Sequence, residues 1–125
     1  DAGLVGLRGA TYLDATETGF PPRLQEPEAV TFGERPVDRV YYSDSSVQLR
    51  DAVLGRVVHI VKSGSPQTVV WNPGKEGDHM RCARPGEWRG FVAVEAAACR
   101  DRGVTLAPGE SHTLSQTLSV ETLDV

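Results

Sequence analysis

The strongest constraint on the fold is the way glycine, proline, asparagine and aspartate interrupt short runs that are rich in valine and threonine. No window of eleven or more residues keeps the apolar spacing of an amphipathic helix, so long amphipathic helices are not expected. Repeated short strands with turn residues between them are typical of an antiparallel β-sandwich, and the predicted fold class is all-β. The residues between Thr16 and Pro27 are predicted to form a loop, because proline cannot donate to a strand ladder. Strands are predicted at Gly3–Leu7, Ala10–Leu13, Ala29–Phe32, Val37–Tyr42, Val47–Leu49, Arg56–Lys62, Gln67–Trp71, Gly90–Ala98 and Thr113–Glu121.

Size and charge narrow the function classes. The chain has 125 residues, which fits one domain over residues 1–125. Its formal net charge of −4 argues against nucleic acid and against anionic membrane surfaces as partners. No apolar run reaches the roughly 18 residues of a membrane span, and no signal-peptide pattern opens the chain. We therefore expect a cytoplasmic protein that binds neither nucleic acid nor membrane.

Cysteine and histidine give no sign of a metal or cofactor site. Cys82 and Cys99 flank one predicted strand, where a bridge is conceivable, but reduced thiols are the expectation for a cytoplasmic protein. The three histidines, His59, His79 and His112, lack metal-ligand spacing. There is no glycine-rich phosphate loop and no serine nucleophile elbow. No metal and no cofactor are predicted.

One carboxylate interrupts the most apolar strand. The run from Phe91 to Ala98 reads as a strand buried on both faces, with Glu95 in its middle. Its same-face neighbours Ala93 and Ala97 are small, which leaves room above the carboxylate for a ligand. A structural ion pair with an arginine such as Arg39 or Arg89 explains a buried glutamate equally well.

Several motifs together resemble one family. The block that starts at Val-Val-Trp-Asn-Pro and continues to Val-Glu-Ala, followed by Leu-Ala-Pro-Gly-Glu, is similar to the hexose-6-phosphate mutarotases. These glucose-6-phosphate 1-epimerases are a branch of the aldose 1-epimerase superfamily. The resemblance covers nearly the whole chain and implies an antiparallel sandwich of the galactose-mutarotase type. The segments that carry it are residues 6–9, 37–41, 69–73, 91–97 and 106–110, with Tyr12 and Asp14.

The resemblance implies a reaction that needs two proton transfers. A base takes the proton of the anomeric hydroxyl and an acid protonates the ring oxygen; rotation about C1–C2 and reclosure then give the other anomer. Glu95 matches the family's glutamate base, and Asp38 matches an aspartate that lines the sugar site. Trp71 and Arg39 are further candidates for substrate binding. The alternatives are an ion pair for Asp38 and Arg39 and a core position for Trp71.

The departures from the family are as informative as the matches. The family's acid histidine lies in a His-Thr-Tyr-Phe-like motif upstream of the Gly-Leu-x-Gly segment, and this sequence opens at Asp1 without it. Gly74 stands where the family usually carries a tryptophan, and Ala93 where it often carries a cysteine. We therefore expect the C-terminal portion of the sandwich, and a chain that is inactive or a poor catalyst alone because half a catalytic constellation loses most of its advantage.

Three functions follow from these observations. The chain is part of a hexose-6-phosphate mutarotase that carries the base without the acid, or a carbohydrate-binding remnant without catalysis, or a β-sandwich interaction module in which Glu95 only forms an ion pair. The expected small-molecule partner is a sugar phosphate such as glucose 6-phosphate. The expected macromolecular partner is a second copy of the chain or an N-terminal segment that completes the sandwich, since a truncated sandwich exposes strand edges.

Overall fold

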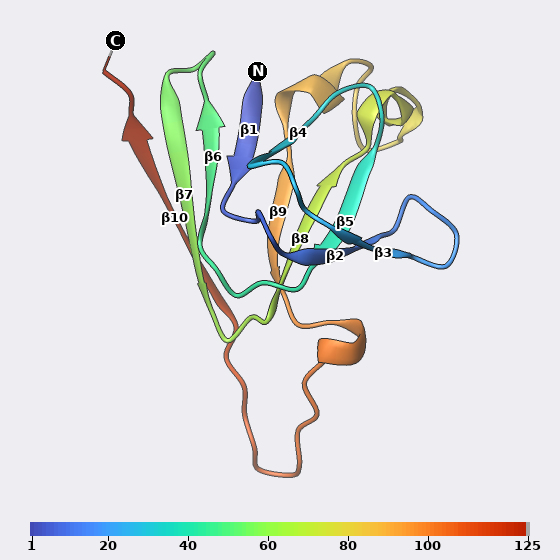
Figure 1. The fold of residues 1–125 in the computed structure, drawn as a ribbon, viewed down its shortest axis with the longest axis vertical. Coiled ribbons are helices and arrows are strands. Elements are labelled where there is room, and N and C mark those ends of the chain that lie inside the picture. The colour runs from blue at the N-terminus through green and yellow to red at the C-terminus, as the bar shows by residue number, and fades with distance from the viewer. Residues whose placement is uncertain (125) are drawn as a thin grey trace.

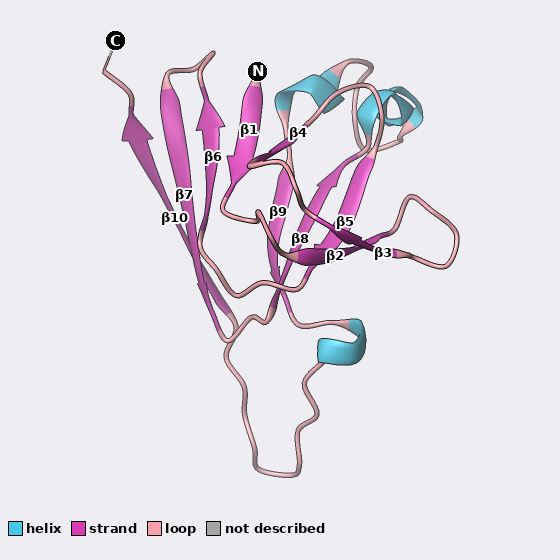
Figure 2. Ribbon diagram, in the orientation of Figure 1, coloured by secondary structure: helices cyan, strands magenta, loops and turns pink. Residues whose placement is uncertain are grey.

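The computed structural model describes residues 1–124, so the last residue of the predicted single domain lies outside the described part. Most regular structure is strand, and the helices are short turns of 3-10 type (Figure 2). The strands are β1 Ala2–Val5, β2 Thr11–Asp14, β3 Pro22–Leu24, β4 Ala29–Thr31, β5 Val37–Tyr41, β6 Val47–Asp51, β7 Arg56–Ser63, β8 Gln67–Asn72, β9 Ala93–Ala97 and β10 Ser115–Thr122. The 3-10 helices are η1 Gly74–His79, η2 Glu87–Gly90 and η3 Arg100–Arg102.

The strands form two five-stranded sheets. The first has the order β10-β7-β6-β1-β4 and lies to the left in Figure 1, and the second has the order β3-β2-β5-β8-β9. Every pairing is antiparallel. The predicted all-β fold with antiparallel sheets is confirmed.

The hydrophobic core joins the two sheets. Both contribute side chains that are at least nine-tenths buried, and these form one cluster: Leu4, Val30, Val47 and Ile60 from the first sheet, Tyr12, Val37, Tyr41 and Val70 from the second, and Leu7 from the loop between them. Because side chains alternate along a strand, the neighbours of core residues on β5 and β8, such as Asp38 next to Val37 and Trp71 next to Val70, point to the opposite face of the second sheet. That outward face carries Asp38 and Trp71.

The predicted strands all occur, with ends that shift by a few residues, and two predictions are wrong. The residues from Thr16 to Pro27 are not entirely loop, because β3 pairs with β2 through Leu24, Arg23 and Pro22. Proline is tolerated there because β3 is the end strand of its sheet and Pro22 is its first residue.

The second error concerns the strand that carries Glu95. It is not buried on both faces: β9 is the end strand of the second sheet, and four of its residues are half-buried while Glu95 is exposed. It also starts at Ala93, because η2 occupies the residues up to Gly90. A run of alanines reads as buried by composition, yet so short a side chain covers little surface at a sheet edge.

The cysteines are free thiols, with Cys82 exposed and Cys99 half-buried. His59 pairs with Glu121 of β10, and His112 contacts the carbonyl of Gly64. Across residues 1–124, no helix has the length and apolar character that crossing a membrane would take.

Candidate active site

The register of the second sheet brings the main sequence candidates to one face. Asp38 of β5 is directly opposite Trp71 of β8, and Trp71 is directly opposite Ala93 of β9. Glu95 lies two residues beyond Ala93 and therefore points to the same side. The strand spacings place the Cα atoms of Asp38 and Glu95 roughly 12 Å apart, and β8, which carries Trp71, lies between their strands. We call this outward surface, defined by Asp38, Trp71 and Glu95, the Asp38–Glu95 face.

Glu95 is open to a ligand. Its side chain is exposed, and within residues 1–124 it forms no ion pair. The arginines that the sequence offered as partners are engaged elsewhere: Arg89 stacks over Trp88 and Arg39 over Tyr12. The ion-pair interpretation of Glu95 is therefore wrong for the described residues.

Asp38 is the more enclosed carboxylate. It is half-buried, and this burial raises the pKa of its carboxyl group, with a further rise from the negative charge of Asp14. The guanidinium of Arg100 opposes both effects and lowers the pKa. An ionised Asp38 is thus an incompletely solvated hydrogen-bond acceptor on a face that has room for a polar ligand.

An aromatic pair closes one end of the face. The rings of Trp71 and Phe91 lie 5.8 Å apart at an angle of 40°. Asn72 fixes the chain on both sides of the pair: its side-chain amide donates to the carbonyls of Phe91 and Trp88, and its carbonyl oxygen accepts from the amide of Gly74. The predicted Asn-Pro turn after β8 is therefore held by a buried amide that satisfies three backbone groups.

The face is a shelf rather than a closed cavity. One hollow, of about 550 Å³, is wide open to solvent; it is lined by Gly86, Glu87, Arg89, Gly90 and Phe91 and adjoins the site through Phe91, which packs on Trp71. A smaller hollow of about 280 Å³ lies on the first sheet around His59. Neither contains Asp38 or Glu95, so a ligand on the Asp38–Glu95 face remains in contact with water on one side.

Arg39 is not brought to this face. It follows Asp38 on the strand and points the opposite way, where its guanidinium donates to the hydroxyl of Tyr41 and the side-chain oxygen of Gln25. It also lies 4.5 Å above the ring of Tyr12. These contacts are with side chains of the core side of the sheet, so the structure separates Arg39 from the other candidates.

Two residues that the sequence did not single out lie next to the site. Arg100 begins η3, a few residues after the end of β9, and Phe20 lies in the β2–β3 hairpin. The guanidinium carbon of Arg100 is 4.1 Å from the centre of the Phe20 ring. They are 80 residues apart in the chain, and neither belongs to a recognisable motif. Only the fold brings them together.

The residues of the site suit proton transfer and hydrogen bonding. In the described part of the chain, no cluster of three or more histidine, cysteine or acidic side chains is placed to hold a metal ion. An exposed carboxylate, a half-buried carboxylate and a flat aromatic surface are the groups that bind a polyhydroxylated ligand and remove a proton from it. His59 and His112 lie in other contacts, and His79 ends η1.

Comparisons with known proteins agree with this arrangement. The family model for aldose 1-epimerase matches residues 5–119. The "Putative glucose-6-phosphate 1-epimerase" of Cenchrus ciliaris is 33% identical over 108 residues, which are 84% of this chain and 32% of that protein. The crystal structure of a "putative mutarotase (YeaD)" from Salmonella typhimurium superposes with a TM-score of 0.75 and 25% identity, over 97% of this chain and 40% of that one. The chain therefore spans about a third of the curated relative.

Proposed function

Because the chain belongs to the aldose 1-epimerase family, we propose that its Asp38–Glu95 face binds a hexose 6-phosphate and supplies the base that interconverts the α and β anomers. The observation that carries the proposal is the register of three strands, which aligns Asp38, Trp71 and Glu95 on the one face of the sheet that is turned away from the core. The phosphate is part of the proposal because the curated relative is described as acting on glucose 6-phosphate.

Each side chain has a part in the proposed reaction. Glu95 takes the proton from the anomeric hydroxyl, and the C1–O5 bond breaks to give the open-chain aldehyde. Asp38 accepts a hydrogen bond from a hydroxyl at the other end of the sugar and keeps the ring from turning as a whole. Trp71 lies on the strand between theirs, and its apolar ring surface covers the C–H side of the sugar. Reclosure after rotation about C1–C2 returns the proton from Glu95.

The proton donor for the ring oxygen comes from outside the described site. None of the three histidines is among the described contacts of Asp38, Trp71 or Glu95. The face is also open to water, which weakens every electrostatic contribution to the transition state. We therefore infer that the chain alone exchanges anomers slowly, and that a further polypeptide segment supplies both the acid and the cover.

The proposal is tested by two-dimensional exchange NMR spectroscopy between the anomers of glucose 6-phosphate, with this chain as the catalyst. Exchange above the buffer rate is expected, and Glu95→Gln is expected to reduce the excess rate by about a hundredfold or more, the usual contribution of a positioned base. Glu110→Gln, in an exposed turn, is the matched control and should leave the rate unchanged. Equal rates for wild type, Glu95→Gln and buffer would remove the catalytic role.

A carbohydrate-binding role without catalysis is the second candidate, and the openness of the face favours it. It predicts that glucose 6-phosphate changes the fluorescence of Trp71 at millimolar concentration while the anomers exchange at the buffer rate. Asp38→Asn should then weaken binding. The absence of any fluorescence response would leave the interaction-module interpretation.

A further inference from the structure

Two residues with side chains adopt a left-handed backbone conformation within residues 1–124, and they contact each other. Phe20 has a φ of 48° and Arg100 a φ of 52°. Residues with a Cβ rarely adopt this conformation because the Cβ crowds the following carbonyl oxygen. Such strain persists only where the surrounding structure holds it, and it concentrates at functional sites. The two strained residues form one stacked pair, so this pair is a candidate for a function.

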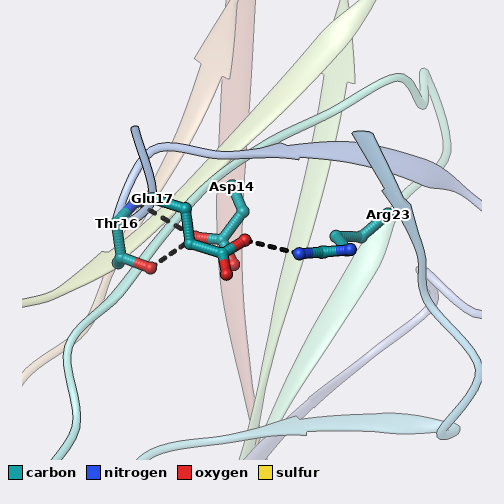
Figure 3. Close-up of polar contacts among 4 residues, drawn as sticks. All are labelled: Asp14, Thr16, Glu17 and Arg23. Atoms are coloured by element: carbon teal, nitrogen blue, oxygen red, sulfur yellow. Dashed lines mark hydrogen bonds and ion pairs between the residues drawn. The ribbon is translucent and has the colours of Figure 1, made fainter. Parts of the chain in front are cut away.

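Side-chain contacts close the hairpin in which Phe20 lies, and Figure 3 shows these contacts. Asp14 accepts hydrogen bonds from the backbone amide and the hydroxyl of Thr16, at 3.0 and 2.6 Å. Arg23 and Glu17 form an ion pair of 2.8 Å across the loop. These contacts close the hairpin that carries Phe20.

The Arg100 side is attached to the second sheet through the residue that follows it. Tyr42 donates its hydroxyl to the side chain of Asp101 at 2.8 Å. Tyr42 follows β5 and points to the same side as Asp38. The short helix η3 is therefore attached at the end of the Asp38–Glu95 face, as its position below the sheet in Figure 1 also shows.

The guanidinium of Arg100 lies within electrostatic range of Asp38, because its positive charge lowers the pKa of that carboxyl group. Stacking on Phe20 uses the flat surface of the guanidinium and leaves its N–H edges outward. In the described chain these N–H groups have no hydrogen-bonded acceptor and no ion-pair partner. Arg100 is thus a pre-positioned cation with unused donors.

We propose that Arg100, seated on Phe20, binds the phosphate group of the sugar and makes the site selective for phosphorylated over neutral hexoses. The inference rests on the proposed function and names its specificity residue. A phosphate dianion that approaches Asp38 and Glu95 meets two negative charges, and a nearby cation offsets this repulsion. The planar fork of arginine matches two phosphate oxygens at once. A neutral hexose makes no use of it.

The test compares two ligands and four proteins. Dissociation constants for glucose 6-phosphate and for glucose are measured by NMR titration of the chain and of Arg100→Gln, Arg100→Gly and Arg102→Gln. Arg100→Gly removes the side chain and suits the left-handed backbone, so a loss of binding there does not come from misfolding. Arg102→Gln is the matched control, since it removes a neighbouring positive charge that stacks on Tyr42.

Both Arg100 variants should bind glucose 6-phosphate about tenfold more weakly, the value of one charge-assisted contact, while their affinity for glucose changes less than twofold. Arg102→Gln should keep the ratio of the two affinities. Inorganic phosphate should compete with glucose 6-phosphate for the wild-type chain and not for Arg100→Gly.

The two proposals fail differently. If the wild-type chain prefers glucose 6-phosphate and both Arg100 variants keep that preference, the role of Arg100 is overturned while the proposed function stands. Equal weakening of both sugars would assign Arg100 a merely structural part and would also overturn it. If neither sugar binds the wild-type chain, the proposed function fails and the inference fails with it.

Discussion

The side-chain amide of Gln116 takes the place of a peptide group beside Val94. Its nitrogen donates to the carbonyl of Val94 at 2.9 Å, and its oxygen accepts from the amide of Ala96 at 3.3 Å. Gln116 belongs to β10 of the first sheet, whereas the two backbone groups belong to the edge of β9 in the second. One side chain thus links the two sheets and caps the strand edge next to Glu95. This contact accounts for the half-buried position of Gln116 on a strand whose other described side chains are exposed.

Replacing Gln116 by leucine should lower the free energy of unfolding by about 1–3 kcal/mol, because a backbone donor and a backbone acceptor lose their partner together. Urea unfolding followed by tryptophan fluorescence measures the change. Thr117→Val, at the next position of β10 where the side chain points to the other face and is exposed, should alter stability by less than about 0.5 kcal/mol. Equal effects from the two substitutions would contradict the bridging role.

Gly74 should resist any side chain. Its φ of 60° is left-handed, and a Cβ built there would lie 2.3 Å from the carbonyl oxygen of Glu34. Because that atom is backbone, it cannot move aside cheaply, and Gly74→Ala should cost about 2 kcal/mol or more in unfolding free energy. Gly33→Ala is the matched control, since nothing lies within 4 Å of its added Cβ. The glycine at the position of the family's tryptophan is therefore required by this loop.

The positions of the strands could be predicted from the local pattern of apolar, polar and turn residues. Alternation and turn residues suffice to mark β5, β7 and β8, whose side chains meet both water and core. The β9 strand was misjudged because its alanines are apolar by composition, and nothing local says that it ends a sheet. The short helices η1 and η2 were missed because they are held by a side chain and by packing, with Asn72 donating to the carbonyl of Trp88.

The site was predicted to the extent that it depends on strand alternation. Asp38 and Glu95 lie on strands whose facing could be read from the sequence, and the register joined them. The same alternation predicts that Arg39 points to the side opposite Asp38. The structure has Arg39 on that side, where it donates to the hydroxyl of Tyr41. The pair of Phe20 and Arg100 could not be predicted, because it depends on two loops meeting in space.

Acid should loosen the loop that ends in Trp88. The carboxylate of Asp78 accepts hydrogen bonds from the amide of Gly86 at 2.7 Å and from the indole nitrogen of Trp88 at 3.0 Å. These hydrogen bonds lower the pKa of Asp78 below its ordinary 3.8, and the bond from Gly86 has the largest effect. A carboxyl whose pKa is lower in the folded state adds stability above pH 3.8 and loses it as pH falls through the lowered value.

The measurement is urea unfolding of wild type and Asp78→Asn at pH 6 and at pH 2.5. The stability difference between them should be present at pH 6 and shrink toward pH 2.5, because protonation makes the Asp78 carboxyl neutral like the asparagine side chain. Asp124→Asn, exposed near the C-terminus, should show no such dependence. If the difference in unfolding free energy between wild type and Asp78→Asn stayed constant with pH, packing and not the charge of Asp78 would stabilise the loop.

Asp38 should show opposite effects on stability and on binding. Burial and the charge of Asp14 raise its pKa, so between pH 3.8 and the raised value the folded chain binds more protons than the unfolded one. Its contribution to stability therefore falls as pH rises through that window, and the ionised carboxylate destabilises the fold at neutral pH.

Asp38→Asn, which removes the charge and keeps the shape, should raise the urea midpoint at pH 7 and weaken glucose 6-phosphate binding about tenfold. Asp124→Asn, exposed near the C-terminus, should change neither. If Asp38 served the fold alone, Asp38→Asn would lower the stability and leave sugar binding unchanged. The opposite result is expected of a functional residue, because residues kept for function often reduce the stability of the fold.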